Sequence, residues 1–174
     1  MPSHSPSEAR ALLLELGAPH RLLRHVELVA EAADLLLGGL RRLHVPVDAN
    51  LVLAGVVLHD AGKLRYPDEL DRPGAQHEAA GRELLLEHGV SPALARICVS
   101  HASWDEPGTS FEELLVALSD KLWKGVRNPG LEERVIDCAA NLLGRTRWDL
   151  FVQLDSLFEQ IASAGSDRLS RSRC

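Results

Sequence analysis

The chain has 174 residues, which is enough for one domain with a substantial hydrophobic core. Hydrophobic residues make up 45% of it and aromatic residues only 4%, so the core must consist mainly of Leu, Ala and Val. The net charge of −6 argues against a general nucleic-acid-binding surface, which requires clustered positive charge.

Other features of the composition exclude further classes of protein. The sequence has no run of about 18 apolar residues, so we expect no membrane span. Its start lacks a basic region followed by a long apolar stretch, so we expect no signal peptide. The three cysteines, Cys98, Cys138 and Cys174, are far apart and show no CxxC spacing. This spacing argues against a disulfide framework or a zinc ribbon and predicts a reduced, cytoplasmic setting.

The pattern of apolar residues predicts helix after helix. Ser7 is predicted to cap the first helix, and Asp48 to cap a buried helix that Gly62 ends. Ser110 and Glu113 fit a capping box. The stretch 65–74 is predicted to be a loop or a single turn. The predicted helices cover, approximately, 8–17, 19–43, 49–61, 75–88, 92–101, 111–125, 131–143 and 147–163.

The sequence has no repeat and no alternating strand pattern, so it predicts an all-α, single-domain helical bundle. We expect an N-terminal helix or extension over 1–18 and a core that carries the candidate site over 19–128. The C-terminal helices over 129–164 are predicted to pack on that core. Residues 165–174 are polar and predict a flexible tail.

The pair His59-Asp60 follows an apolar run directly. Every residue from 51 to 58 is apolar or Gly, which predicts a helix that is buried on all sides. An imidazole and a carboxylate at the end of such a helix are unfavourable unless both find partners. A hydrogen-bonded pair or a bound metal ion would satisfy them.

Two further polar residues lie at inward positions. On its helix His25 shares a face with Leu22 and Val29, so it points toward the core. Alone, it is better explained as a hydrogen-bonded core histidine than as a metal ligand. Asp120 also has apolar neighbours on its helix, and its alternative explanation is a solvated ion pair with Lys124.

His77 begins one predicted helix and His101 ends another, where an exposed histidine is unremarkable. The inward polar groups described above, which come from three other helices, would all be satisfied together by one divalent cation. Imidazole and carboxylate form a transition-metal ligand set. His77 and His101 can supply a second ion, with Asp60 bridging the two. The inward groups are His25, His59-Asp60 and Asp120.

The order of these residues resembles the HD-domain superfamily of metal-dependent phosphohydrolases over about residues 20–125. The sequence segments that carry the resemblance are "RHVELVAEAADLL", "VVLHDAGK", "HEAAGRELL" and "LVALSDKL". The presence of both additional histidines implies the binuclear type and a helical bundle of the HD-domain type. The resemblance implies that metal one binds His25, His59, Asp60 and Asp120, and that metal two binds Asp60, His77 and His101.

The resemblance implies hydrolysis of a phosphoester or phosphoanhydride bond by a metal-bridging hydroxide. Asp60 and Lys63 are then the candidate catalytic residues, since Lys63 lies one turn after Asp60 and its ammonium suits a phosphate. Lys63 is otherwise explained as a solvated lysine at a helix end. The candidates for binding substrate phosphates are Lys63, Arg65, Lys124 and Arg127.

The expected substrate is a small phosphorylated molecule, with nucleotides among the candidates, and we expect neither a membrane nor a nucleic acid as partner. The residue types leave the metal open among Fe, Mn, Co, Ni and Zn. Two alternatives remain, namely an HD-domain di-iron oxygenase and a non-catalytic metal- or ligand-binding helical module. The helices after residue 130 are available for an oligomer interface.

Overall fold

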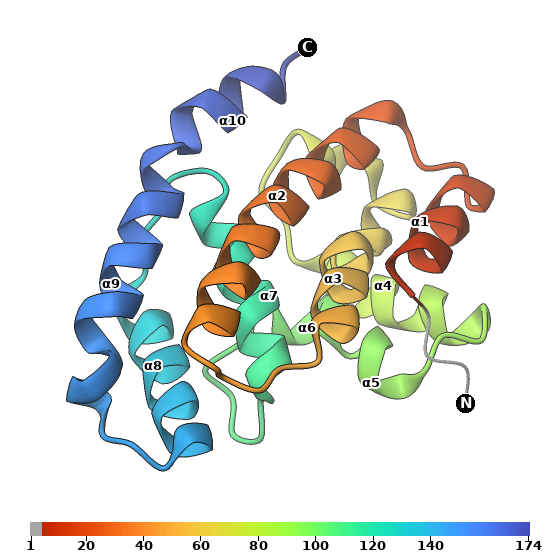
Figure 1. Cartoon of the computed structure of the whole chain (residues 1–174). Helices are drawn as coiled ribbons and strands as arrows, with labels where there is room; N and C mark the ends of the chain where they lie inside the picture. Colours follow the sequence, from red (N-terminus) through yellow and green to blue (C-terminus); the bar gives the residue numbers. More distant parts are fainter. Residues whose placement is uncertain (1–4) are drawn as a thin grey trace.

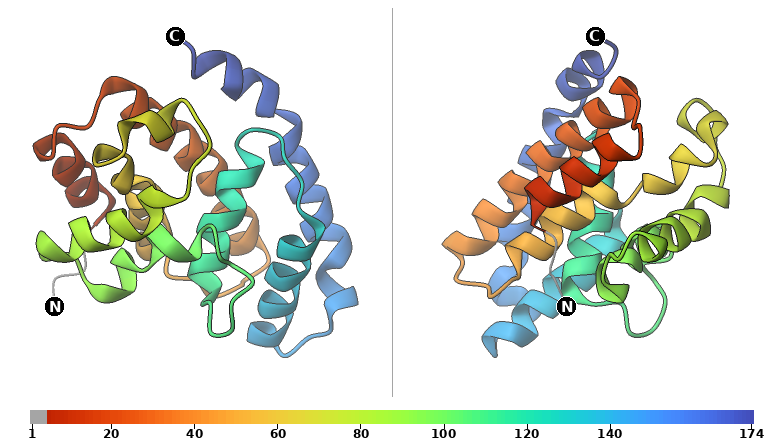
Figure 2. Two further views of the ribbon diagram at one scale, coloured as in Figure 1. Left: turned by 180° about the vertical axis from the view of Figure 1, so that it is seen from behind. Right: turned by 90° about the vertical axis from the view of Figure 1, so that its right-hand side faces the viewer.

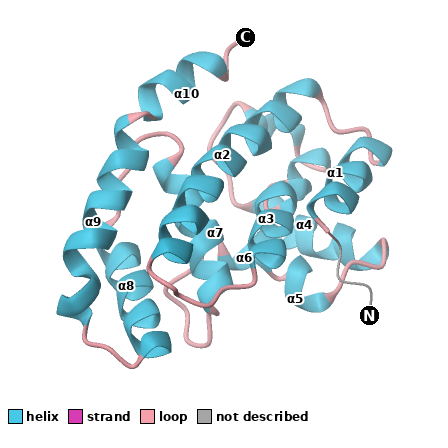
Figure 3. Cartoon of the chain, viewed as in Figure 1, coloured by secondary structure: helices cyan, strands magenta, loops and turns pink. Residues whose placement is uncertain are grey.

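A computed structural model describes residues 5–174, and all of the regular structure in this part of the chain is helical (Figure 3). The all-α prediction is therefore confirmed. No helix within the described residues combines the length and apolarity that crossing a membrane requires. The helices are α1 (Pro6–Glu15), α2 (His20–Arg42), α3 (Ala49–Leu58), α4 (Gln76–Glu87), α5 (Pro92–Ala95), α6 (Ile97–Ser100), α7 (Phe111–Leu122), α8 (Pro129–Leu143), α9 (Arg147–Ser163) and α10 (Gly165–Arg171), with short 3₁₀ helices η1 (Ala61–Leu64) and η2 (Pro67–Leu70).

Helix α3 lies at the centre of the molecule, in contact with α1, α2 and α7 (Figure 1). Its sequence, ANLVLAGVVL, is apolar all round, which suits a helix covered on several sides. Helices α4 to α6 lie on one side of this centre, and the paired helices α8 and α9 lie on the other (Figure 2). The centre is thus the place where elements from distant parts of the sequence meet.

Several helix ends differ from the predictions, those of α1 and α3 among them, and the helix predicted over 92–101 is divided into α5 and α6. Helix α1 begins at Pro6, two residues earlier than predicted, because Ser5, rather than Ser7, caps it in a reciprocal capping box with Glu8. Helix α3 begins at the predicted cap, Asp48, but ends at Leu58 rather than near residue 61. The capping box of Ser110 with Glu113 is confirmed.

Gly62 does not end α3; it lies within η1 and allows that segment to touch α4. A Cβ atom on Gly62 would lie 1.7 Å from the carbonyl oxygen of His77 and 2.6 Å from the backbone nitrogen of Gly81. A Cβ atom on Gly81 would in turn lie 2.9 Å from the nitrogen of Gly62. The two backbones therefore meet directly, and this contact sets the separation between Asp60 and His77.

The C-terminal segment forms helix α10 where the sequence predicts a flexible tail. Arg168 is 1% exposed and donates hydrogen bonds to the carbonyl oxygens of Trp123, at 3.0 Å, and Ile161, at 2.7 Å. Gly165 packs against the backbone of Gly125, where a Cβ atom would lie 2.3 Å from nitrogen. These tertiary contacts order a segment whose own sequence is polar.

The Gly62–α4 contact leads to a prediction about stability. Replacing Gly62 with Ala forces η1 away from α4, so we expect the free energy of unfolding to fall by about 3 kcal/mol. In the matched control Gly38→Ala, the added methyl meets only Arg42, at 3.8 Å, in the interior of α2. That control should gain up to about 1 kcal/mol from helix propensity. Urea unfolding measures both, and equal stabilities of the two variants would contradict the packing described.

Candidate metal centre

Six polar side chains converge on one point inside the bundle, and each comes from a different element or the junction of two. They are the six residues whose positions in the sequence predict a metal site. The members are His25 on α2, His59 at the end of α3, Asp60 before η1, His77 in the first turn of α4, His101 after α6 and Asp120 on α7.

The carboxylate of Asp60 lies at the middle of this group and divides it into two halves. Its Oδ2 atom is 3.1 Å from Nε2 of His25 and 3.5 Å from Nε2 of His59. Its Oδ1 atom is 3.3 Å from Nε2 of His77 and 3.7 Å from Nε2 of His101. Each oxygen thus faces its own pair of imidazoles, as a carboxylate that bridges two cations does.

Asp120 completes the first half of the group. Its Oδ1 atom is 3.4 Å from Nε2 of His59 and 3.9 Å from Nε2 of His25. Ligand atoms of His25, His59 and Asp120 all lie within 4.8 Å of one another, which one ion can span. No ion pair between Asp120 and Lys124 forms within residues 5–174, so Asp120 faces inward rather than toward solvent.

The Nδ1 atoms of three histidines are already engaged. Nδ1 of His59 is 2.6 Å from the carbonyl oxygen of Val56, and Nδ1 of His101 is 3.0 Å from that of Ile97. Since a carbonyl oxygen only accepts hydrogen bonds, each Nδ1 carries a proton. In the neutral imidazole Nε2 then presents its lone pair to the centre, as in metal-bound histidines.

Glu69, which the sequence analysis missed, orients the third of these histidines. Its carboxylate accepts a short hydrogen bond from Nδ1 of His77. It also accepts hydrogen bonds from the backbone nitrogens of His77, at 3.0 Å, and Gln76, at 3.1 Å. Helix α4 follows Ala75, which cannot cap it, and this lack of a local cap was the only sequence signal for an acceptor from elsewhere.

Among residues 5–174, two nitrogen atoms of the centre are buried without a hydrogen-bond partner. They are Nε2 of His25 and Nε2 of His59, which lie near carboxylates but outside hydrogen-bonding geometry. Unsatisfied buried polar atoms are rare because each costs the free energy of its lost hydration. A cation between these nitrogens and the carboxylates would satisfy them, so the residues present fit a metal ion.

Burial and the neighbouring charges shift the pKa values of several side chains of the centre strongly. Burial alone would lower the pKa of His59, but the charges of Asp60 and Asp120 raise it to about 9. Burial, together with the nearby His59 cation, lowers the pKa of His101 to about 4. Burial works to raise the pKa of Asp60, yet the surrounding imidazoles and Lys63 hold it well below its usual range. Both carboxylates of the centre are therefore ionised at neutral pH.

Of the four predicted phosphate-binding residues, Lys63 alone contacts the metal centre and lines the pocket beside it. Its ammonium donates a hydrogen bond of 2.7 Å to Oδ2 of Asp60. Arg65 instead pairs with Glu87 on α4, at 2.6 Å. The structure does not bring Arg65, Lys124 or Arg127 to the pocket beside the centre.

Arg127 lies in a network of acids outside the centre. Its guanidinium is 2.8 Å from Glu132, 2.6 Å from Asp155 and 2.5 Å from Glu159. These three carboxylates come from α8 and α9, so Arg127 joins the C-terminal pair of helices to the end of α7.

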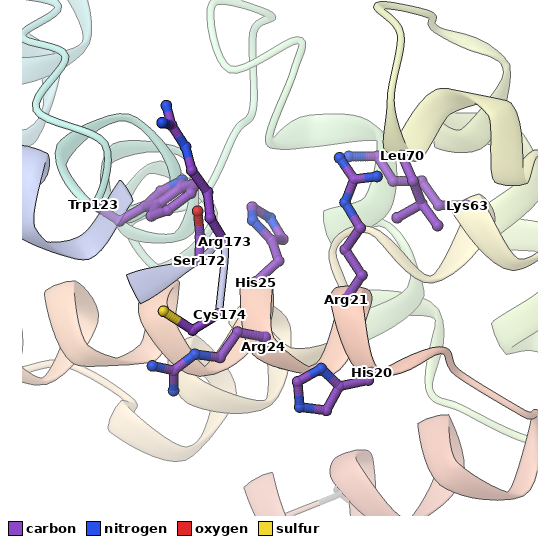
Figure 4. A pocket seen from close by; sticks show the side chains of 10 residues that line it. All are labelled: His20, Arg21, Arg24, His25, Lys63, Leu70, Trp123, Ser172, Arg173 and Cys174. Carbon is purple, nitrogen blue, oxygen red and sulfur yellow. The ribbon is translucent and has the colours of Figure 1, made fainter. Parts of the chain in front are cut away.

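A pocket of about 650 Å³ opens onto the centre (Figure 4). His25 and Lys63 belong both to its wall and to the metal centre. The indole of Trp123, another wall residue, packs edge-to-face on the His25 ring, with ring centroids 5.0 Å apart. The lining residues are His20, Arg21, Arg24, His25, Lys63, Leu70, Trp123, Ser172, Arg173 and Cys174.

Comparison with known proteins identifies one family. The family described as HD domain matches residues 22–139. A tRNA (cytidine(56)-2'-O)-methyltransferase of Picrophilus torridus is 26% identical over 156 residues, which cover 88% of this chain and 41% of that protein. A protein of the same name from Thermoplasma volcanium is 27% identical over 139 residues, covering 71% and 38%. The chain spans about two fifths of the length of these curated relatives, and no solved structure matches it significantly.

The field at the centre predicts how its histidines titrate. In protein stripped of metal, His59 should stay protonated until the pH passes about 9, and His101 should stay neutral down to about 4. Asp120→Asn removes a negative charge beside His59 and should lower the pKa of His59. NMR titration of labelled histidines measures these values. A cation that binds Nε2 of His59 displaces its proton, so metal affinity should rise with pH up to about 9. A His59 that titrates at the ordinary pKa would contradict this field.

Proposed function

The chain belongs to the HD-domain family, and from this membership and the geometry of its centre we propose that it is a metal-dependent hydrolase of phosphoester or phosphoanhydride bonds. The observation that carries the proposal is the carboxylate of Asp60, whose two oxygens face two separate pairs of imidazoles. That arrangement supports a pair of cations rather than one.

The ligand atoms divide naturally between two ions. Once a bound cation displaces the proton of His59, both sets would consist of neutral imidazole nitrogens and ionised carboxylates, which favour Fe, Mn, Co, Ni or Zn over magnesium and calcium. We propose that His25, His59, Asp60 and Asp120 hold one ion and that Asp60, His77 and His101 hold the other.

When bound, such a pair of ions lowers the pKa of a shared water to near neutrality and offsets the negative charge of a phosphoryl group under attack. The chain's own residues position the reacting groups. Asp60 is 3% exposed, so its carboxylate is held in a water-poor site. Lys63 links the centre to the pocket, and its ammonium is placed to donate to a phosphate oxygen as well as to Asp60.

The pocket supports a small phosphorylated substrate. Its volume of about 650 Å³ falls within the range of small-molecule sites. Cationic side chains predominate among its charged residues, which favours an anionic ligand although the whole chain has a net charge of −6.

The name of the two curated relatives raises methyl transfer as a rival activity. We do not propose it for this chain, because the match covers only 41% and 38% of those proteins. The cluster of histidines and carboxylates also suits cation binding rather than a methyl donor. We propose that the shared region is the helical HD domain and that methyl transfer by the relatives involves their remaining parts.

The hydrolase proposal predicts anaerobic phosphate-ester cleavage by the manganese- or iron-loaded protein. Release of p-nitrophenol from p-nitrophenyl phosphate and its diester measures it. Asp60→Asn should lose bound metal and more than about a hundredfold in turnover, because both ions lose a ligand. The matched control Asp34→Asn changes an exposed residue of α2 and should retain both.

Three results would contradict the proposal. Normal turnover by Asp60→Asn would mean that the site is misassigned. Oxygen consumption by the iron-loaded protein without anaerobic phosphate-ester cleavage would identify the di-iron oxygenase. A purified chain that retains no metal and is equally stable with a chelator would identify a non-catalytic module.

The hydrogen bond from His77 to Glu69 predicts a selective effect on one ion. Glu69→Gln removes the charged acceptor that orients His77, so the second ion should bind about tenfold more weakly while the first is unchanged. Asp68→Asn alters a neighbouring exposed carboxylate of η2 and serves as the charge-matched control. Calorimetric titration with Mn²⁺ resolves the two sites, and equal weakening of both ions would show that Glu69 acts through folding alone.

A further inference from the structure

The Lys and Arg side chains that line the pocket beside the centre face no Asp or Glu within the lining. Four cationic side chains line this pocket. Placing like charges around one cavity is unfavourable unless an anion offsets their repulsion. The four are Arg21, Arg24, Lys63 and Arg173.

These cations differ in how far acidic residues neutralise them. Arg21 pairs with Asp71, Arg24 lies 3.6 Å from Glu27, and Lys63 contacts Asp60. Within the described part of the chain, no carboxylate forms an ion pair with the guanidinium of Arg173. Arg173 therefore offers its full charge to a ligand in the pocket.

A second wall residue also lacks a partner. Trp123 is 7% exposed, and its Nε1 atom is buried with no hydrogen-bond acceptor among residues 5–174. An indole N–H can only donate, so it requires an oxygen atom from a ligand or a water molecule. In Figure 4 the Trp123 indole lies on the same side of His25 as Arg173.

Helix α10, which ends two residues before Arg173, is tied to α2, and the backbone nitrogen of Arg173 donates a hydrogen bond of 3.3 Å to the carbonyl oxygen of Ser170 in α10. Arg171 forms two hydrogen bonds with Glu31 of α2, at 2.6 and 2.7 Å. The carbonyl oxygen of Arg171 accepts a hydrogen bond of 3.2 Å from Nε of Arg24, another pocket residue. The residues after this helix, Ser172 to Cys174, thus bring to the pocket a segment that lies outside residues 22–139, the part matched by the family.

We propose that the substrate carries a second phosphate group, which Arg173 and Arg24 bind together with the indole N–H of Trp123. The substrate class is a small organic di- or polyphosphate, and Arg173 is the residue that selects it. Lys63 lies on the opposite side of His25 from Arg173 (Figure 4). A phosphate group bound at the metal centre beside Lys63 therefore leaves the Arg173 side of the pocket open to a second anionic group. The inference rests on the proposed function, because it treats the pocket as the substrate site of that centre.

Anion binding by manganese-loaded protein, in which the first phosphate group has its metal site, tests this arrangement without depending on turnover. The probes are inorganic orthophosphate and pyrophosphate, the latter as its non-hydrolysable methylene analogue, measured by calorimetry. Wild-type protein should bind pyrophosphate at least about tenfold more tightly than orthophosphate, and Arg173→Gln should remove about tenfold of the pyrophosphate affinity while changing orthophosphate little. Trp123→Phe keeps the ring against His25 but removes the N–H, so it should also weaken pyrophosphate selectively.

The matched control is Arg145→Gln, which removes the same charge from an exposed residue between α8 and α9, at the opposite end of the molecule from α10 (Figure 1). It should leave both affinities unchanged. Equal wild-type affinities for the two anions, or an equal loss of both in Arg173→Gln, would overturn the proposal.

The outcomes separate this inference from the proposed function. A metal-loaded chain that hydrolyses phosphate esters but shows no preference for pyrophosphate overturns the inference alone. A chain that prefers pyrophosphate through Arg173 but cleaves no phosphate ester overturns the proposed function instead.

Discussion

The site depends on one buried carboxylate, Asp60, enclosed by imidazoles on both of its oxygens. Burying this charge is costly unless cations or donors surround it closely. Five other elements therefore have to deliver their polar side chains to the same point. The bundle meets this requirement because η1 packs on α4, α6 contacts both α4 and α3, and α2 and α7 pack against α3.

Contacts made by the backbone fix the positions of the side chains that form the centre. Gly62 and Gly81 let η1 rest on α4, which brings Asp60 within reach of His77. Carbonyl oxygens at the ends of α3 and α6 hold Nδ1 of His59 and His101. These contacts leave the Nε2 atoms facing Asp60, so the centre is already oriented before any cation binds.

The sequence was sufficient for the all-α fold and for the six residues that converge. His25 and Asp120 stood out because each interrupts an apolar helix face, and His59-Asp60 stood out because it ends an apolar run. Glu69 could not be found this way, since it lies in a turn whose sequence has no period and acts on a residue eight positions away. The partners of Arg127 come from α8 and α9, so only the packed helices reveal its ion pairs.

Helix α10 illustrates the same limit. Its polar sequence predicts no packing face, and the carbonyl oxygens that accept from Arg168 belong to residues at positions 123 and 161. Tertiary hydrogen bonds of this kind override local composition. As a result, a segment outside the family match contributes one end of the pocket beside the centre.

Anomalous diffraction from a manganese-loaded crystal tests the central claim most directly. The account predicts two peaks about 3.5–4 Å apart, one bound through each oxygen of Asp60. A single peak that takes both oxygens of Asp60, or a centre without any peak in the presence of saturating manganese, would contradict it.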